Sequence, residues 1–438
     1  MYCERMKEEF LYYIWQQKLF MTLPQITTDG LPVEVIDVGR RNVLSGPDFF
    51  NAKLRIGNTV WAGNVEMHCK SSDWYKHGHQ EDAAYDNVIL HVVMVNDMSI
   101  SRRDGQKLSQ MVLQWPAWLN ENYHSLCCSK EQLPCMKRLH QIPSIFFADW
   151  LNGLVVERLQ QKHTFITQQL EQNVHNWEET FYWVIARNFG FHTNSLPFEW
   201  TARSLPLMCI AKHKNNLLQI EAMLFGQAGL LPTEPEDEYS ARLLQEYQFL
   251  QNKFQLTPIK EGVWKMGGVR PGNSPYIRLA QLASLLHNSS KLFSKILETE
   301  HLHELYRLFE VQPSDYWQTH TRFAQANKMT RKTLGKSSIT ILLINTVIPM
   351  LFAYGKQQNN EHLCERALDF LQQLPSEQNT IIQQWEQAGI HSKNAFESQA
   401  LLQLWHCYCD EKKCLRCRIG HKILTCSPRT EKKNEKME

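Results

Sequence analysis

One stretch, GPDFFNAKLRIGNTVWAGNVEMHCK (residues 46–70), constrains the fold of this chain more than any other. It contains two runs of alternating apolar residues, separated by a Gly-Asn pair. Such a pair between alternating runs is typical of a β-hairpin. Side chains alternate along a strand, so Glu66, His68 and Lys70 share one face of the second run. The stretch therefore predicts a hairpin with an acid, an imidazole and an amine in a row.

Asp48 precedes the first strand of this hairpin, close to the polar face of the second. Carboxylates hold a hard cation such as Mg2+ or Mn2+, and a neighbouring base orients water. We therefore expect Asp48 and Glu66 to bind a divalent metal, and His68, helped by Lys70, to orient or activate water. The plainer alternative is that Asp48 only closes a turn and that Glu66 and His68 lie on an exposed strand face.

The flanking sequence predicts the other elements of an N-terminal domain. Residues 4–20 carry apolar side chains at helical spacing, and residues 33–38 alternate like a strand. Residues 87–95 form a β-branched run, as in a strand that is covered on both faces. Residues 23–32 are predicted to be a loop, and the polar connection 71–86 is predicted to include a short helix. The resulting order is α-β-β-β-α-β.

This order, with Pro47-Asp48 before one strand and Glu66-x-His68 in the next, resembles the PD-(D/E)xK nuclease superfamily over residues 4–95. The resemblance implies a restriction-endonuclease-like fold and metal-dependent hydrolysis of DNA or RNA phosphodiester bonds. His68 stands where that superfamily usually has lysine, and Lys70 is the nearest substitute. This histidine favours an alternative, a non-catalytic nucleic-acid- or protein-binding scaffold with a degraded site.

The connection after the hairpin offers a second set of ligands. His77, His79 and Asp82 lie close together there, and histidines with a carboxylate are typical zinc ligands. A zinc-dependent hydrolase, with His68 joining these three residues, is therefore a further alternative. The plain interpretation is a turn with solvated histidines. His91, inside the apolar strand, is predicted to be a core imidazole that is hydrogen-bonded to its neighbours.

From residue 143 onward the pattern predicts an α-helical body. Residues 191–199 are predicted to be a loop within it. Residues 339–353 form the longest apolar stretch, which is short for a membrane span and contains Pro349. We expect a kinked core helix there, and no membrane-spanning segment.

A turn inside this body offers a phosphate site. Arg270, Asn273 and Arg278 belong to a rigid, proline-flanked turn, and guanidinium forks with free backbone N–H groups grip phosphate. We therefore expect nucleic-acid binding by these three residues. The alternative is a helix connector whose arginines pair with carboxylates. The formal net charge of +2 gives the whole chain no general attraction for polyanions, so any such site must be local.

Longer stretches, among them IEAMLFGQAGLL (220–231) and RPGNSPYIRLAQLA (270–283), are similar to a bacterial family catalogued as domain of unknown function 2851. The similarity extends over essentially the whole chain and implies little about activity. Gly268 and Ser274 depart from the family pattern, in which we expect an arginine and a phenylalanine.

The chain contains 12 cysteines, and its first ten residues are charged where a secretory signal would be apolar. We therefore expect a cytoplasmic protein with reduced thiols. Cysteines crowd near the C-terminus, where soft ligands suit a structural Zn2+ ion: Cys407, Cys409, Cys414 and Cys417. The nuclease resemblance adds an iron–sulfur cluster as a rival, with Cys128 or Cys135 as an early ligand. Unliganded thiols are the third alternative.

The predicted fold class is α+β. The predicted domains are a nuclease-like α/β domain (1–120), a Cys-containing linker (121–142, with a loop at 123–135), an α-helical domain (143–400), a Cys-rich segment (401–426) and a disordered tail (427–438).

Overall fold

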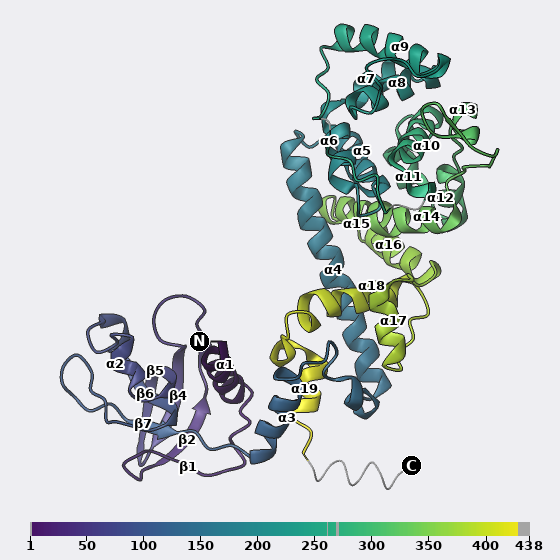
Figure 1. Cartoon of the computed structure of the whole chain (residues 1–438). Coiled ribbons are helices and arrows are strands. Elements are labelled where there is room, and N and C mark those ends of the chain that lie inside the picture. The colour runs from purple at the N-terminus through teal and green to yellow at the C-terminus, as the bar shows by residue number, and fades with distance from the viewer. Residues whose placement is uncertain (1, 261, 269–270, 428–438) are drawn as a thin grey trace. The chain divides into compact units, whose positions relative to one another are not determined.

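The computed structural model describes residues 2–260, 262–268 and 271–427 (Figure 1). The protein is a mixed α+β chain with an N-terminal sheet and a mostly helical remainder, as the sequence predicts. Nearly all of the predicted tail lies outside the described residues.

The chain divides into two compact units. The first comprises Met1–Phe147 together with His406–Glu438, and the second is Ala148–Trp405. The Cys-rich residues from His406 onward therefore belong to the same unit as the N-terminal sheet, although the whole helical unit separates them in the sequence.

The sheet of the first unit has the strand order β1-β2-β4-β5-β6-β7, and β3 pairs with β4 beside this path. Strands β2, β4 and β5 form an antiparallel meander, whereas β6 and β7 add in parallel. The strands are β1 (Gln25–Ile26), β2 (Pro32–Asp37), β3 (Arg40–Arg41), β4 (Phe49–Ile56), β5 (Thr59–Lys70), β6 (Val88–Val95) and β7 (Gln110–Val112).

The predicted hairpin is confirmed. Strands β4 and β5 are joined by the Gly-Asn turn, and Ile56 pairs with Thr59. The pairing shifts between Phe49 and Ala52, and such a bulge bends the strand and redirects its side chains. This irregularity lies directly after Asp48, the predicted metal ligand. One expectation is corrected: residues 23–32 are not wholly a loop, because β1 forms there by pairing with β2.

Helices cover the sheet. Helix α1 (Tyr2–Gln16) packs on β5 through a buried apolar stripe, and the Trp15 indole N–H donates to the Val38 carbonyl at 3.0 Å. The predicted short helix is α2 (Asp73–Lys76), which is followed by a 3-10 turn at Ala83–Tyr85. Trp74 and Tyr85 anchor these two segments in an apolar cluster with Val88, Ile100 and Leu108.

The rest of the first unit is helical. Its helical elements include α3 (Ala117–Cys127), a 3-10 segment (Met136–Gln141), a second 3-10 turn (Cys414–Arg416) and α19 (Arg418–Leu424). Helix α19 packs on α3, where the Asn122 amide donates to the carbonyls of Ile423, Leu424 and Cys426. The predicted loop 123–135 is therefore wrong in its first part, because residues 123–127 complete α3 and bury Tyr123 and Leu126.

The second unit is helical, with one small hairpin of β8 (His320–Arg322) and β9 (Gln325–Ala326). The predicted loop 191–199 is shorter than expected, because a helix begins at Ser195 and its Pro197 lies in the first turn, where proline is tolerated. The helices are α4 (Ser144–Gln172, which begins at the end of the first unit), α5 (Trp177–Phe189), α6 (Ser195–Ser204), α7 (Leu207–Lys212), α8 (Leu217–Gln227), α9 (Glu238–Phe254), α10 (Pro275–Asn288), α11 (Leu292–Glu298), α12 (Leu302–Phe309), α13 (Asp315–Thr319), α14 (Lys336–Leu342), α15 (Ile348–Gln357), α16 (Glu361–Gln373), α17 (Thr380–Gln387) and α18 (Ala395–Leu404).

The long apolar stretch is a continuous helix over Lys336–Gln357, with a π-helical turn at Leu343–Val347 that ends two residues before Pro349. A π turn supplies the irregularity that a proline inside a helix requires. By length and composition this helix could cross a membrane, but 78% of its most apolar window is buried inside the protein. That burial is typical of a core helix.

Candidate functional site

Asp48 and Glu66 meet where β4 begins beside β5. The Asp48 amide donates to Glu66 Oε2 at 3.0 Å, and the Met67 amide donates to Asp48 Oδ2 at 3.0 Å. Burial, and then the Glu66 charge, raises the pKa of Asp48 to about 8. Burial also raises the pKa of Glu66 to about 8. Each carboxylate therefore accepts a backbone N–H from the neighbouring segment, and burial favours the protonated form of both acids or a nearby cation.

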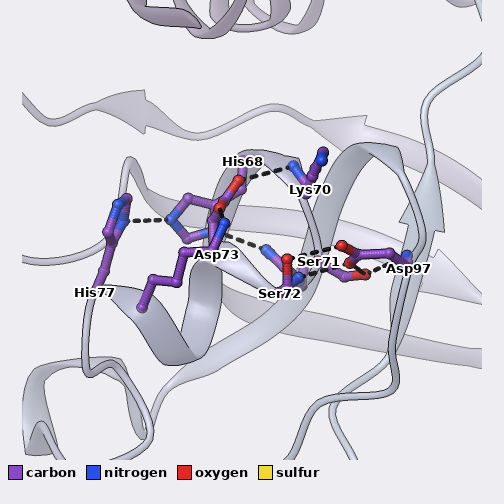
Figure 2. A network of polar contacts seen from close by, with 9 residues as sticks. His68, Lys70, Ser71, Ser72, Asp73, His77 and Asp97 are labelled. Carbon is purple, nitrogen blue, oxygen red and sulfur yellow. Dashed lines mark hydrogen bonds and ion pairs between the residues drawn. The ribbon is translucent and has the colours of Figure 1, made fainter. Parts of the chain in front are cut away.

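Three imidazoles gather beside Glu66. Nε2 of His68 lies 3.0 Å from Nδ1 of His77, a contact that Figure 2 draws as a dashed line. Glu66 Oε1 lies 3.5 Å from His68 Nε2 and 3.3 Å from His79 Nε2. Each of the three histidines offers one ring nitrogen, and these nitrogens all lie within 4.8 Å of one another.

These distances are similar to those between neighbouring ligand atoms around one metal ion. Nitrogen ligands bind zinc at about 2.0–2.1 Å, so neighbouring ligands of a tetrahedral ion lie about 3.3–3.4 Å apart. The contacts that link His68, His77, His79 and Glu66 measure 3.0, 3.3 and 3.5 Å. His79 Nε2 is buried and makes no hydrogen bond within the described part of the chain. An unprotonated His79 Nε2 in this position is suited to donate its lone pair to a metal ion.

The local backbone explains how His77 and His79 reach one place. His77 caps α2, and Gly78 has a φ of +75°, which side chains with a Cβ rarely adopt. The chain can therefore turn between two histidines. The start of α2 is in turn held by Asp97, which accepts from the Ser72 amide at 2.8 Å (Figure 2). Hydrogen bonds from Ser72 lower the pKa of Asp97 to about 2.

His91 supports the cluster from β6. Its Nε2 lies 2.9 Å from His68 Nδ1, and its side chain is fully buried, as expected of a core imidazole. Burial, and then neighbouring histidines, lowers the pKa of His68 to about 2 and that of His91 to about 3. Both rings are therefore neutral at physiological pH, which is the protonation state that binds metals.

Aromatic residues wall the cluster. The His79 ring stacks on Tyr85 with centroids 3.8 Å apart, and Trp74 lies edge-on against His79 at 5.4 Å. On the other side, the Tyr12 hydroxyl hydrogen-bonds the Asp48 carboxylate. Tyr12 is a site residue that sequence reasoning missed, because helical spacing alone does not tell a packing tyrosine from one that faces an acid.

Two other predicted site residues are exposed and do not belong to the group of converging ring nitrogens. Lys70 is exposed at the end of β5, where its backbone amide donates to Asp73 Oδ2 at 3.0 Å. Asp82 is also exposed, and its Oδ1 accepts from the Ala84 amide at 2.9 Å as the cap of a 3-10 turn. The carboxylate beside the histidines is therefore Glu66, whereas the predicted zinc site had Asp82 as its carboxylate ligand.

The predicted phosphate turn lies in the helical unit. Arg270 is outside the described residues. Arg278 is buried and directs its guanidinium inward, to Gln281 at 2.8 Å and to Asn273 Oδ1 at 2.5 Å. It also lies over the Phe191 ring at 4.1 Å. Asn273 and Arg278 are thus in contact, but they hydrogen-bond to each other, and Arg278 also bonds to Gln281 inside the protein.

The predicted cysteine ligands lie at the C-terminal end of the first unit. Cys409 and Cys417 are buried, while Cys407 and Cys414 are half-buried. Cys407 and Cys409 share the π-helical turn Trp405–Cys409.

No curated protein and no solved structure matches the chain. A family described as "Protein of unknown function (DUF2851)" matches residues 8–380, which include the sheet, the histidine cluster and most of the helical unit. The chain therefore belongs to the DUF2851 family.

Proposed function

We propose that this protein is a metal-dependent hydrolase whose ion is bound by His68, His77, His79 and Glu66. The spacing of these four side chains carries the proposal: three ring nitrogens lie within 4.8 Å of one another, and Glu66 Oε1 lies 3.3–3.5 Å from two of them. Three nitrogen ligands suit Zn2+ better than Mg2+ or Mn2+, because imidazole is a softer ligand than carboxylate or water.

The substrate class that we propose is the phosphodiester bond of DNA or RNA. It is supported by the antiparallel meander β2-β4-β5 followed by the parallel strand β6, with Asp48 and Glu66 meeting on neighbouring strands. The resemblance to PD-(D/E)xK nucleases implies such an arrangement. A divalent ion there would polarise a phosphoryl oxygen and acidify a water molecule.

Within this proposal Asp48 is the general base. It is half-buried and its backbone amide donates to the proposed ligand Glu66, which places a carboxylate near the proposed ion to accept a proton from its water. His68 becomes a ligand rather than the group that activates water. His91 positions His68, and the exposed Lys70 is free to meet a phosphate group.

The test is metal-dependent hydrolysis by purified protein that has been stripped of metal and reloaded with Zn2+, Mn2+ or Mg2+. Plasmid nicking and hydrolysis of bis(4-nitrophenyl) phosphate are measured for the wild type, His79→Ala and a matched control, His124→Ala. His124 is exposed on α3. Loss of a ligand should reduce the rate by about 100-fold or more, while the control keeps the wild-type rate.

Two results would overturn the proposal in different ways. Metal binding without hydrolysis of either substrate would favour the non-catalytic scaffold. Absence of metal binding at all, measured by calorimetry with Zn2+ and Mn2+, would leave the histidines as packing residues. Equal activity in His79→Ala and wild type would point to a contaminating nuclease.

A further inference from the structure

A cavity of about 250 Å3 lies inside the helical unit, among residues of α5, α7, α10 and α11 (Figure 1). Helices α10 and α11 both contact α5. Buried apolar side chains form most of the wall: Phe181, Ile185, Ile210, Leu286 and Leu292. A cavity of about 150 Å3 with a wall of this kind stays dry and takes up benzene. The cavity in the helical unit therefore has room for a ring-sized apolar body with a short side chain.

The wall also contains one buried hydroxyl group. Tyr182 lies on the same face of α5 as Glu178 and Ile185, and all three residues line the cavity. Tyr182 is 1% exposed, and among the described residues no group forms a hydrogen bond with its hydroxyl. Burial raises the pKa of Tyr182 well above its usual value, so the hydroxyl keeps its proton. Because a buried donor without a partner is costly, this hydroxyl is suited to an acceptor atom on a molecule in the cavity.

Positive charge lies at the mouth of the cavity. Solvent reaches the lining residues Ala211, Ser290 and Lys291, which mark this mouth. Lys214 lines the cavity beside them, and its ammonium donates to Ser290 Oγ at 3.1 Å. An ammonium group has three N–H donors, so Lys214 keeps donors for a ligand. The mouth is therefore suited to an anionic group.

Glu178, the acid of this wall, is already bonded to the start of α11. Its Oε1 accepts from the Ser294 amide at 2.8 Å and from the Ser294 hydroxyl at 2.6 Å, and its Oε2 accepts from the Phe293 amide at 3.2 Å. These donors stabilise the carboxylate charge. Glu178 therefore does not take up the donors of the two lysines, which remain for an anionic ligand.

We propose that this cavity binds a small organic acid with an apolar, ring-sized body. The carboxylate lies at the mouth, beside Lys214 and Lys291, and the body packs against Phe181 and Leu286. An oxygen atom on the body accepts the hydrogen bond of the Tyr182 hydroxyl. An apolar pocket with a few placed polar groups is the usual form of a small-molecule site. This binding goes beyond the proposed hydrolysis, because the cavity belongs to the second unit and the histidine cluster to the first.

The experiment measures the affinity of the full-length protein for three probes by titration calorimetry. Para-hydroxyphenylacetate carries the acid and the second oxygen, phenylacetate lacks that oxygen, and tyramine has an ammonium in place of the carboxylate. We expect para-hydroxyphenylacetate to bind about 10-fold more tightly than phenylacetate, because it gains one hydrogen bond to a buried donor. Tyramine should not bind. Binding of tyramine as tight as that of the acids, or no binding of either acid, would overturn the inference.

Tyr182→Phe tests the buried hydroxyl. It should reduce the affinity for para-hydroxyphenylacetate by about 10-fold and leave that for phenylacetate unchanged. The ligand-free variant should melt at the same or a higher temperature than wild type, because it loses a buried hydroxyl that has no partner. Tyr354→Phe, at a half-buried position outside the wall, is the matched control. Equal affinities of Tyr182→Phe and wild type for para-hydroxyphenylacetate, or a lower melting temperature of ligand-free Tyr182→Phe, would contradict the assigned role.

Two variants at the exposed mouth complete the test without disturbing the core. Ala211→Trp should block the entry of both acids, and Lys291→Gln should weaken the binding of both. Lys260→Gln, at an exposed position of the same unit, should bind like wild type. Unchanged binding in Ala211→Trp would place the acids elsewhere and overturn the inference. His79→Ala should bind the acids normally, so the proposed function and this inference fail separately.

Discussion

Nδ1 of His68 lies 2.9 Å from Nε2 of His91, across the parallel pair β5 and β6. This contact leaves the other nitrogen of His68, Nε2, directed toward His77 and Glu66. A histidine ligand usually donates its second N–H to a partner that fixes its tautomer and orientation. His91 is therefore a positioning residue for the histidine cluster.

Replacing His91 should weaken metal binding without removing a ligand. We expect His91→Leu to lower Zn2+ affinity by about 10- to 100-fold, because His68 loses its acceptor. His91→Gln, which keeps an acceptor, should recover part of the affinity. Competition with a chromophoric chelator measures both, and His140→Leu, at an exposed position, is the control. Equal affinities for His91→Leu and wild type would show that the contact only packs the core.

Replacing Glu66 by glutamine should separate stability from metal binding. The amide oxygen can still accept from the Asp48 amide, and the new NH2 group faces His68 and His79. Because burial raises the pKa of Glu66 to about 8, the acid takes up a proton when the metal-free protein folds at pH 7. Glutamine removes this cost and should stabilise the metal-free protein by about 1–3 kcal/mol. Zn2+ should then no longer raise the melting temperature, as it does for the wild type. Calorimetric melting with and without Zn2+ is the measurement, and a lower melting temperature of metal-free Glu66→Gln would contradict the expected cost of burying this acid.

Replacing Asp82 by alanine distinguishes the two sets of zinc ligands. Its side chain caps the turn at Ala83–Tyr85 through the Ala84 amide, and loss of such a cap costs about 1 kcal/mol. We therefore expect Asp82→Ala to lower the free energy of unfolding slightly while zinc content stays unchanged. Elemental analysis decides, since loss of zinc in this variant would make Asp82 a ligand after all.

Glu221 in the helical unit should make stability depend on pH. It is 1% exposed and accepts from the hydroxyls of Tyr239 at 2.5 Å and Ser314 at 2.9 Å. Burial raises its pKa from 4.5 to about 7, so the folded state holds this proton more tightly than the unfolded state. Its stabilising contribution is complete below pH 4.5 and is lost as the pH rises through 7.

Between pH 5 and pH 8 the wild type should therefore lose about 2–3 kcal/mol of unfolding free energy relative to Glu221→Gln, which cannot ionise. Urea unfolding at several pH values measures this difference. Glu234→Gln, at an exposed position, should follow the wild type. Parallel pH profiles for wild type and Glu221→Gln would mean that Glu221 titrates normally in the folded protein.

Gly226 is required where α8 meets α9. A Cβ at this position would overlap the Tyr247 ring, and overpacking of this kind costs about 1–3 kcal/mol. We expect Gly226→Ala to lower the melting temperature measurably. Gly153→Ala is the matched control, because a Cβ there meets only Trp150 at 3.8 Å, and alanine in an exposed helix is stabilising by about 0.5–1 kcal/mol. Similar melting temperatures for both variants would mean that α9 shifts without cost.

Several features follow from local pattern alone. The hairpin of β4 and β5, the buried strand β6 and helix α1 were predicted because apolar period and turn residues act over a few neighbouring positions. Membership of the DUF2851 family was likewise predicted, from similar stretches of sequence, and is confirmed.

The partners within each site were decided by tertiary structure. Sequence spacing offered Asp82 beside His77 and His79, but the parallel pairing of β5 with β6 and the turn at Gly78 set Glu66 against the imidazoles instead. In the same way the C-terminal cysteines belong to the same unit as Cys135 only because the chain returns to its first unit after Trp405. The sequence by itself determined which chemical groups are present and which local elements carry them. Only packing between distant segments decided which groups meet, because contact depends on the folded path rather than on distance along the chain.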